Sequence, residues 1–342
     1  MSGKFKPVII WLIIGAVMVF IMTAIGGITR LTESGLSMVN WNLFMGAVPP
    51  LSEEAWQKTF EEYQKFPEYK TTHNHFSLED FKGIFFWEYI HRLFGRLIGV
   101  VFLIPFFIFL KRGLLKGKLL KQLLFLLTMG AFQGFLGWYM VSSGLIHEPR
   151  VSHFRLAAHL STAFFTISYS LWIALGLWQA NSEPVIADST TKRITFITVA
   201  ILCIQIVFGA FVAGKDAGMI HNFWPNMNPG EFISSEVFNG NNLLDTLINN
   251  PSGIQFTHRY LAYVVSILII YLWFRSKSKT DHITSSKFLF ASIIVCIQFT
   301  LGILTLLFHV PLIVALLHQL GALLLLLAMV SATHRLTNAI SK

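Results

Sequence analysis

Eight long apolar runs, separated by polar segments, divide the whole chain. Each run is close to the roughly 20 residues that an α-helix needs to cross a bilayer. The pattern therefore predicts an all-α integral membrane protein with eight transmembrane helices. The predicted spans are Pro7–Gly27, Trp87–Leu110, Leu119–Val141, Phe154–Trp178, Ile194–Ala213, Ile254–Phe274, Phe288–Leu307 and Pro311–Val330.

Two long polar segments interrupt the spans, and the rest of the chain leaves no room for a separate soluble domain. Residues Ile28–Phe86 include PPLSEEAWQKTFEEYQKFPEYK, which predicts one or two short amphipathic surface helices. Residues Lys215–Gly253 are rich in Asn and Gly, which predicts an ordered loop rather than a helix. The composition agrees with a membrane protein: 54% of the residues are hydrophobic and 13% are charged, against about 25% charged in soluble domains.

The net charge of +9 could indicate a nucleic-acid partner, but the distribution of the charge excludes that class. Basic residues gather in the short connections at 111–121, 192–193 and 275–287, which alternation of the spans places on one side. This is the positive-inside pattern, so we expect both termini in the cytoplasm and both long loops outside. Because neither a cleavable signal nor an Arg/Ser-rich presequence is recognisable, we expect a bacterial inner membrane.

The two halves of the chain, residues 1–180 and 190–336, resemble each other. The second span begins with IHRLFGRLIG and the sixth with THRYLAYVVS, so His91 corresponds to His258. The fourth span contains RLAAHLSTAF and the eighth VALLHQLGAL, so His159 corresponds to His318. The chain is thus predicted to form two repeated four-helix bundles with the same orientation in the membrane.

These four histidines share one predicted depth. Each falls within about the first two turns of an even-numbered span, which places it in the outer part of the bilayer. The residue four positions later, on the same helix face, is small in every case. These small residues are Gly95, Ala163, Ala262 and Ala322.

Two imidazoles on facing helices, with small residues beside them, suit a haem whose iron takes one imidazole on each face. Zinc usually takes three or four nitrogen or sulfur ligands, and each half offers two well-placed histidines. A di-iron carboxylate site needs two Glu-x-x-His pairs and two further acids. The chain has one such pair, Glu88 with His91, and no other carboxylate within the predicted spans, which excludes this site.

Arginines near the histidines are candidate partners for haem propionates. Arg92 and Arg259 directly follow two of the histidines, and bidentate pairing with carboxylate is typical of Arg; the alternative is that they reach the membrane interface. Arg30 and Arg155 are weaker candidates at the outer side. The remaining histidines fall in loops or at span ends and are expected to be surface or loop residues: His73, His75, His147, His153, His221, His282, His309 and His334.

Several motifs together resemble the haem A synthase family, over nearly the whole chain. They are GGITRLTESGLSMVNW, WEYIHRLFGRLIG, HEPRVSHFRLAAHLSTA, QFTHRYLA and LLHQLGALLLL. The long first outer loop, without a cysteine pair, is similar to the mitochondrial and proteobacterial branch of that family.

The resemblance implies a substrate, a cofactor and partners. Haem O would lie between His91 and His159, and a resident haem b between His258 and His318. The C8 methyl of haem O would be oxidised to a formyl group with oxygen from water, with Glu88 as the catalytic residue, giving haem A for cytochrome c oxidase. Haem O synthase, the oxidase assembly machinery and membrane lipid would be the partners. The electron acceptor and the oligomeric state, a homo-oligomer included, stay open.

Two other function classes stay open on the residues alone: a dihaem b-type cytochrome that transfers electrons, and a transporter built from repeats with a proton relay. One difference between the halves favours an enzyme. Alignment on the histidines sets Glu88 against Gln255, and Arg92 against Arg259. We therefore expect the N-terminal half to be catalytic. The structural alternative is an ion pair between Glu88 and Arg92, four residues apart on one helix.

Overall fold

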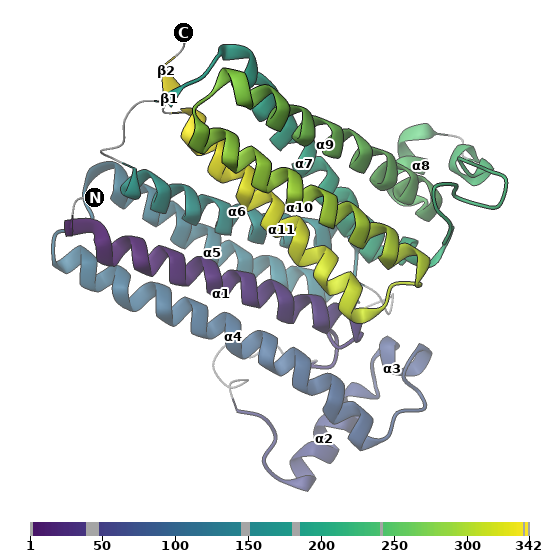
Figure 1. Ribbon diagram of the computed structural model, residues 1–342. Helices are drawn as coiled ribbons and strands as arrows, with labels where there is room; N and C mark the ends of the chain where they lie inside the picture. Colours follow the sequence, from purple (N-terminus) through teal and green to yellow (C-terminus); the bar gives the residue numbers. More distant parts are fainter. Residues whose placement is uncertain are drawn as a thin grey trace. The chain divides into compact units, whose positions relative to one another are not determined.

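Eight long helices dominate the computed structural model, which describes residues 3–38, 48–144, 151–179, 185–239, 242–337 and 339–340 (Figure 1). By length and apolar composition, all eight can cross a membrane, which confirms the predicted all-α membrane fold. They are α1 (Lys6–Leu31), α4 (Leu78–Lys111), α5 (Gly117–Gly144), α6 (His153–Trp178), α7 (Ser189–Gly214), α9 (Pro251–Lys279), α10 (His282–Leu307) and α11 (Leu312–Thr337).

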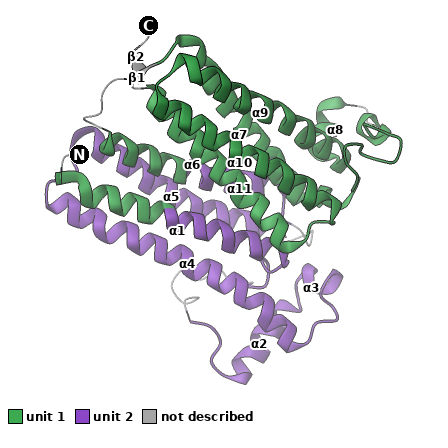
Figure 2. Ribbon diagram, in the orientation of Figure 1, with its two compact units in different colours: residues 1–16, 167–342 green, residues 17–166 purple. Residues whose placement is uncertain are grey.

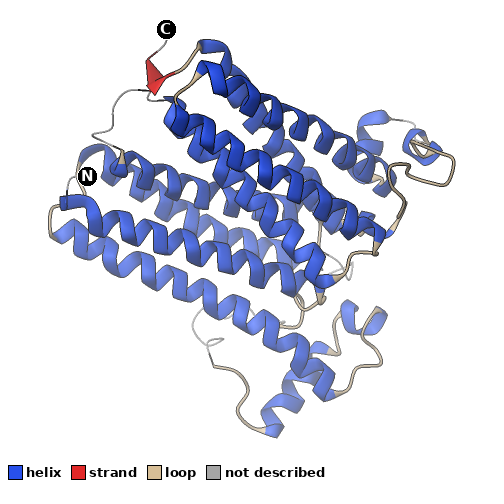
Figure 3. Ribbon diagram, in the orientation of Figure 1, coloured by secondary structure: helices blue, strands red, loops and turns tan. Residues whose placement is uncertain are grey.

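Shorter elements connect the long helices (Figure 3). The first predicted outer loop contains α2 (Glu53–Tyr63) and α3 (Pro67–Thr71), as its amphipathic sequence predicts. The segment expected to be an ordered loop contains a helix, α8 (Leu243–Asn249), and this expectation was partly wrong. Asn242 caps α8 by accepting a hydrogen bond from the N–H of Leu244, so an Asn that signals a loop also starts a helix here. The other short elements are η1 (Gly3–Phe5), η3 (Ala217–Met219), η4 (Ser235–Phe238), β1 (Val185–Ile186) and β2 (Ala339–Ile340).

The described chain forms two compact units (Figure 2). Unit 1 comprises Met1–Ala16 and Ile167–Lys342, and unit 2 comprises Val17–Thr166. The predicted halves, residues 1–180 and 190–336, describe the sequence repeat and stay a prediction.

Unit 1 is built around α7, α9, α10 and α11, which pack closely together. Its centre is apolar: the side chains of Ile269, Phe288 and Leu323 are fully buried. The last turns of α6 join this unit, because the rings of Trp172 and His334 lie 4.7 Å apart at a steep angle. Outward-facing apolar residues such as Ile313 are 69% exposed, as lipid-facing positions are.

In unit 2, α4 begins well before its apolar run, and the predicted start at Trp87 was wrong. Ser77 and Asp80 form a capping box that starts the helix at Leu78. The first turns then bury Phe81 and Phe85 against the outer segment. Consequently His91 lies far along α4, whereas the other three histidines lie near the starts of their helices.

An aromatic cluster fixes the outer segment to α4. Phe81 packs against Phe60 and Tyr63 of α2, with ring centroids 5.2 and 5.1 Å apart. Trp56 packs edge-on against Phe85 at 5.0 Å. Because Phe60, Tyr63, Phe81 and Phe85 are buried, this segment forms a small packed core with the first turns of α4.

We expect Phe81→Ala to destabilise this outer core by roughly 3–5 kcal/mol, since it leaves a cavity among the rings of Trp56, Phe60, Tyr63 and Phe85. Phe86→Ala is the matched control, because Phe86 is 52% exposed on the same helix. Limited proteolysis of residues 53–77 checks the prediction. Equal cleavage rates for the two variants would contradict it.

Candidate functional site

The predicted histidine pairs come together, one pair in each unit. In unit 1, the ring centroids of His258 on α9 and His318 on α11 lie 6.3 Å apart, with the ring planes at 84°. In unit 2, His91 on α4 lies close enough to His159 on α6 for the two side chains to interact electrostatically.

A glycine on the preceding odd-numbered span faces three of these rings. A Cβ added to Gly26 would lie 3.2 Å from Nε2 of His91. A Cβ added to Gly209 would lie 3.1 Å from Cε1 of His258, and one added to Gly302 would lie 2.9 Å from Cε1 of His318. The sequence predicted small residues on the histidine's own helix. It did not predict these three glycines, because their contact with the imidazole is between two helices.

The residues fit a haem bound by one imidazole on each face. Two metal–nitrogen bonds of about 2 Å each, together with half of each ring, account for the 6.3 Å between His258 and His318. At the three glycines, the helix surface has no side chain, so the imidazole can lie directly against it. Within the described ranges, no three His, Cys, Asp or Glu side chains converge as a protein zinc site requires.

Glu88 is held by three hydrogen bonds, from Arg92 and from the segment that follows α1. The side chain is 3% exposed. Its Oε1 accepts from the Arg92 guanidinium at 2.5 Å, and its Oε2 accepts from the Ser37 hydroxyl at 2.8 Å and the Met38 backbone N–H at 2.6 Å. Arg92 also donates to the Met38 carbonyl at 2.8 Å. The ion pair that the sequence offered as the structural alternative is therefore present, and it fastens the segment after α1 to α4.

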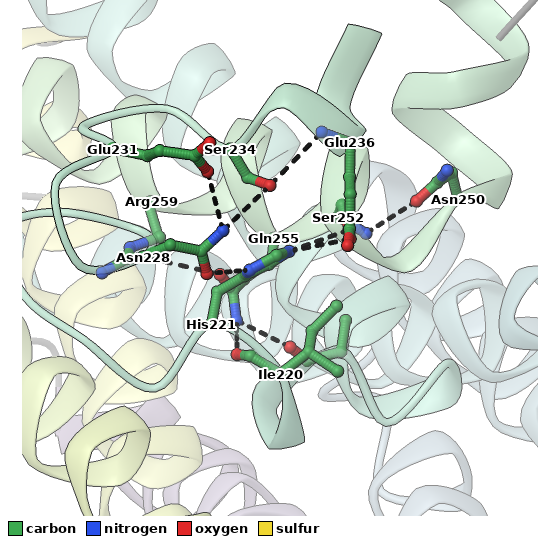
Figure 4. A network of polar contacts seen from close by, with 11 residues as sticks. Ile220, His221, Asn228, Glu231, Ser234, Glu236, Asn250, Ser252, Gln255 and Arg259 are labelled. Atoms are coloured by element: carbon green, nitrogen blue, oxygen red, sulfur yellow. Dashed lines mark hydrogen bonds and ion pairs between the residues drawn. The ribbon is translucent and has the colours of Figure 1, made fainter. Parts of the chain in front are cut away.

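In unit 1, Gln255 and Arg259 likewise fasten the segment after α7 to α9 (Figure 4). The Gln255 amide donates to the carbonyls of Ala217 at 2.7 Å and Ile220 at 2.5 Å, just after α7. Arg259 donates to Gln255 Oε1 at 3.4 Å and to the Asn226 carbonyl at 3.2 Å. The two units thus share one clamp of opposite polarity, because the carboxylate accepts from the loop and the amide donates to it.

The other two arginines lie apart from these clamps. Arg155 donates to the carbonyl of Tyr139 at 2.7 Å and lies 3.8 Å above the Tyr139 ring, so it binds the end of α5. Arg30 lies in the last turn of α1 and is half-buried.

His221 lies in the loop after α7, as expected, and its side chain is buried there (Figure 4). Its two ring nitrogens lie 2.8 Å from Asn228 Oδ1 and 2.9 Å from Ser252 Oγ. Ser252 also donates to Glu236 at 2.8 Å, so the ring joins the loop to the start of α9. His73, His153 and His334 are buried as well, while His147 lies outside the described residues.

A second buried polar cluster lies in the outer core of unit 2. The Tyr63 hydroxyl lies 2.9 Å from Glu68 Oε2 and 2.7 Å from His73 Nδ1. On its other side, His73 Nε2 lies 3.7 Å from Glu33. Burial, with added repulsion from the Glu88 and Glu33 carboxylates, raises the pKa of Glu68 to about 8. Burial lowers the pKa of His73 below 6.5.

One hydroxyl hydrogen joins the cluster. Tyr63 has a single hydroxyl hydrogen, so it donates to only one of its two neighbours. The Tyr63 hydroxyl donates that hydrogen to Glu68 Oε2. Its oxygen is then left to accept from Nδ1 of His73.

The cluster predicts that the outer core loses stability between pH 6.5 and 8. A carboxyl whose folded pKa is raised stabilises the fold below its ordinary pKa of 4.5 and loses that contribution as pH rises through about 8. The lowered pKa of His73 acts in the opposite sense: it adds stability as pH rises through the ordinary pKa of 6.5, and this gain is nearly complete by about pH 7.5. The slope is at most about 1.4 kcal/mol per pH unit.

Hydrogen exchange in residues 53–71, measured from pH 6.5 to 8 and corrected for intrinsic rates, checks this. Glu68→Gln should remove the pH-dependent loss of protection, while Glu54→Gln, an exposed change on α2, should retain it. A pH-dependent loss of protection that persisted in Glu68→Gln would show that another group is responsible.

The comparisons with known proteins agree over almost the full length. The family model described as cytochrome oxidase assembly protein matches residues 9–330. A protein named "Heme A synthase" from Flavobacterium johnsoniae is 49% identical, over 98% of this chain and 100% of its own length. Proteins of the same name from Nitrosospira multiformis and a Caulobacter species are 41% and 40% identical, over 97% and 95% of this chain and 94% of each relative.

Proposed function

Because this chain belongs to the family of cytochrome oxidase assembly proteins that includes these relatives, we propose that it oxidises haem O to haem A in its N-terminal half. Haem A synthesis is the function that the family supports, and it makes the chain a membrane-bound enzyme of haem biosynthesis. We assign different tasks to the two halves because the histidine pair is repeated, with a carboxylate beside one pair and an amide beside the other.

In the N-terminal half, we assign His91 and His159 to the substrate. Haem O would take one imidazole on each face, with its ring edge toward the glycine surface at Gly26. Conversion of the C8 methyl to a formyl group replaces hydrogen by oxygen from water, so protons and electrons must leave the site. Glu88 is the carboxylate nearest to His91, one helical turn away, and it is the proposed catalytic residue.

Glu88 would act from a fixed position rather than as a mobile base. Its three hydrogen bonds hold the carboxyl group in place, which suits stabilisation of positive charge on an oxidised carbon. Any proton that it accepts would weaken the bond to Arg92. The clamp would thus couple the chemistry to the segment after α1.

In the C-terminal half, we assign His258 and His318 to a resident haem b, whose iron would supply one-electron redox chemistry. Gln255 cannot carry a negative charge, so this half would hold its haem and pass electrons. Of the four candidate arginines, Arg92 and Arg259 would support the haem edge from the clamps. Arg30 and Arg155 would be further partners for propionates.

The basic residues in the short connections support a position in a bacterial inner membrane, with both termini in the cytoplasm and the outer core outside. Haem O synthase would supply the substrate there, and the product would pass to the oxidase assembly machinery. A homo-oligomer is compatible with this arrangement. The two alternatives, a dihaem electron carrier and a transporter, are not favoured by the family.

We expect His258→Ala to remove the resident haem b, because one of its two axial ligands is lost. Haem extraction and mass measurement of the purified protein check this. The control is His282→Ala, an exposed histidine on α10. Unchanged haem b in His258→Ala would disprove the assigned pair.

We expect Glu88→Gln to retain haem and to stop haem A formation, with loss of activity of at least about a hundredfold. The amide keeps the shape but cannot accept all three hydrogen bonds, so proteolysis after α1 is measured in parallel. Gln255→Glu is the matched control in the other half. Near-normal haem A from Glu88→Gln, with an intact outer core, would leave Glu88 as a structural residue.

A further inference from the structure

A Gln-x-x-x-Gly pair recurs in three of the four odd-numbered spans. Gln133 precedes Gly137 on α5, Gln205 precedes Gly209 on α7, and Gln298 precedes Gly302 on α10. On α1, the corresponding pair is Met22 and Gly26. Each pair lies opposite one of the four histidines on the next span.

The three glutamines make the same contact. Their side-chain NH2 groups donate to the backbone carbonyls of the histidines on the next span, at 2.9 Å for His159, 2.9 Å for His258 and 2.8 Å for His318. This bond fastens the helical turn that carries each histidine to the neighbouring helix.

The imidazoles are also contacted directly. The amide nitrogen of Gln133 lies 3.2 Å from Nδ1 and 3.3 Å from Nε2 of His159, and that of Gln205 lies 3.1 Å from Nδ1 of His258. For His318, the backbone carbonyl at Gln298 lies 3.2 Å from Nδ1. Partners at the second ring nitrogen orient a histidine that binds metal through the first.

A histidine that binds iron through Nε2 carries its hydrogen on Nδ1 and needs an acceptor there. For His318, the backbone carbonyl of Gln298 lies at that nitrogen. In the part of the chain that the structure describes, the buried Oε1 atoms of the three glutamines have no hydrogen-bond partner, so each side chain acts through its NH2 group.

The fourth pair lacks this amide. The Met22 thioether cannot donate a hydrogen bond, and its terminal methyl group lies 3.4 Å from the position of a Cβ on Gly95, one turn beyond His91. The His91 ring is also turned differently, because its Nε2–Cδ2 edge faces Gly26, whereas His258 and His318 turn Cε1 toward their glycines.

We propose that Gln133, Gln205 and Gln298 are positioning residues that lock three haem ligands, and that Met22 leaves His91 as the one exchangeable ligand. This inference rests on the proposed function, in which the N-terminal haem is a substrate and must enter and leave. His159 would hold the substrate haem firmly on one face while His91 releases it on the other. The resident haem, locked on both faces by Gln205 and Gln298, would stay.

The test exchanges the two side chains between the halves. Full-length protein is loaded with haem b, and each site is read separately after both histidines of the other half are changed to Ala. Two rates are measured: transfer of haem to a soluble haem-scavenging apoprotein, and carbon monoxide binding to the reduced haem, which requires one imidazole to leave. Both are spectroscopic and independent of haem A formation.

We expect Met22→Gln to slow both rates at the N-terminal site by roughly tenfold or more, since partners of ligating histidines are typically worth 10–100-fold in metal affinity. Gln205→Met should accelerate both rates at the C-terminal site by a similar factor. Met22→Leu, which also lacks an amide, should behave like the unchanged protein.

Unchanged rates in both Met22→Gln and Gln205→Met would overturn the inference. If Met22→Gln does not take up haem, Gln205→Met decides alone: faster exchange supports the inference, and an unchanged rate overturns it. Failure of the proposed function looks different, because haem extraction from the purified protein would then yield neither haem O nor haem A, whatever the exchange rates.

Discussion

A polar side chain inside a bilayer must find a partner within the protein, because the hydrocarbon offers none and an unpaired group costs several kcal/mol. This constraint shapes the surroundings of all four histidines. Glu88 is neutralised by Arg92, Gln255 is bound to loop carbonyls, and three glutamines hold the histidine turns. The loops supply several of these partners, so that hydrogen bonds connect loop residues with helix side chains in each unit.

The repeat keeps some polar groups and changes others. His91 and Arg92 recur as His258 and Arg259, whereas Glu88 stands against Gln255. Exchange of a carboxylate for an amide of nearly the same shape changes the charge of the position more than its packing. Two sites of similar architecture can therefore differ in their electrostatics.

The sequence predicted what depends on local pattern, and missed what depends on contacts between elements. Apolar runs and repeated motifs were sufficient for the eight spans and the histidine pairs. The start of α4 was missed because the apolar run alone does not include residues such as Phe81, which pack against α2. The glycines at 26, 209 and 302 were missed because their role is on another helix. Buried His73 and His221 were missed because a polar loop sequence gives no sign of its own core.

The length of α4 has a mechanical consequence. Its 34 residues extend about 51 Å, well beyond the roughly 30 Å of hydrocarbon in a bilayer. The aromatic cluster holds one end of this helix, and no proline interrupts it between Leu78 and His91. The outer core, Glu88 and His91 are therefore connected by one continuous helix, so that a displacement of the outer core would move both side chains.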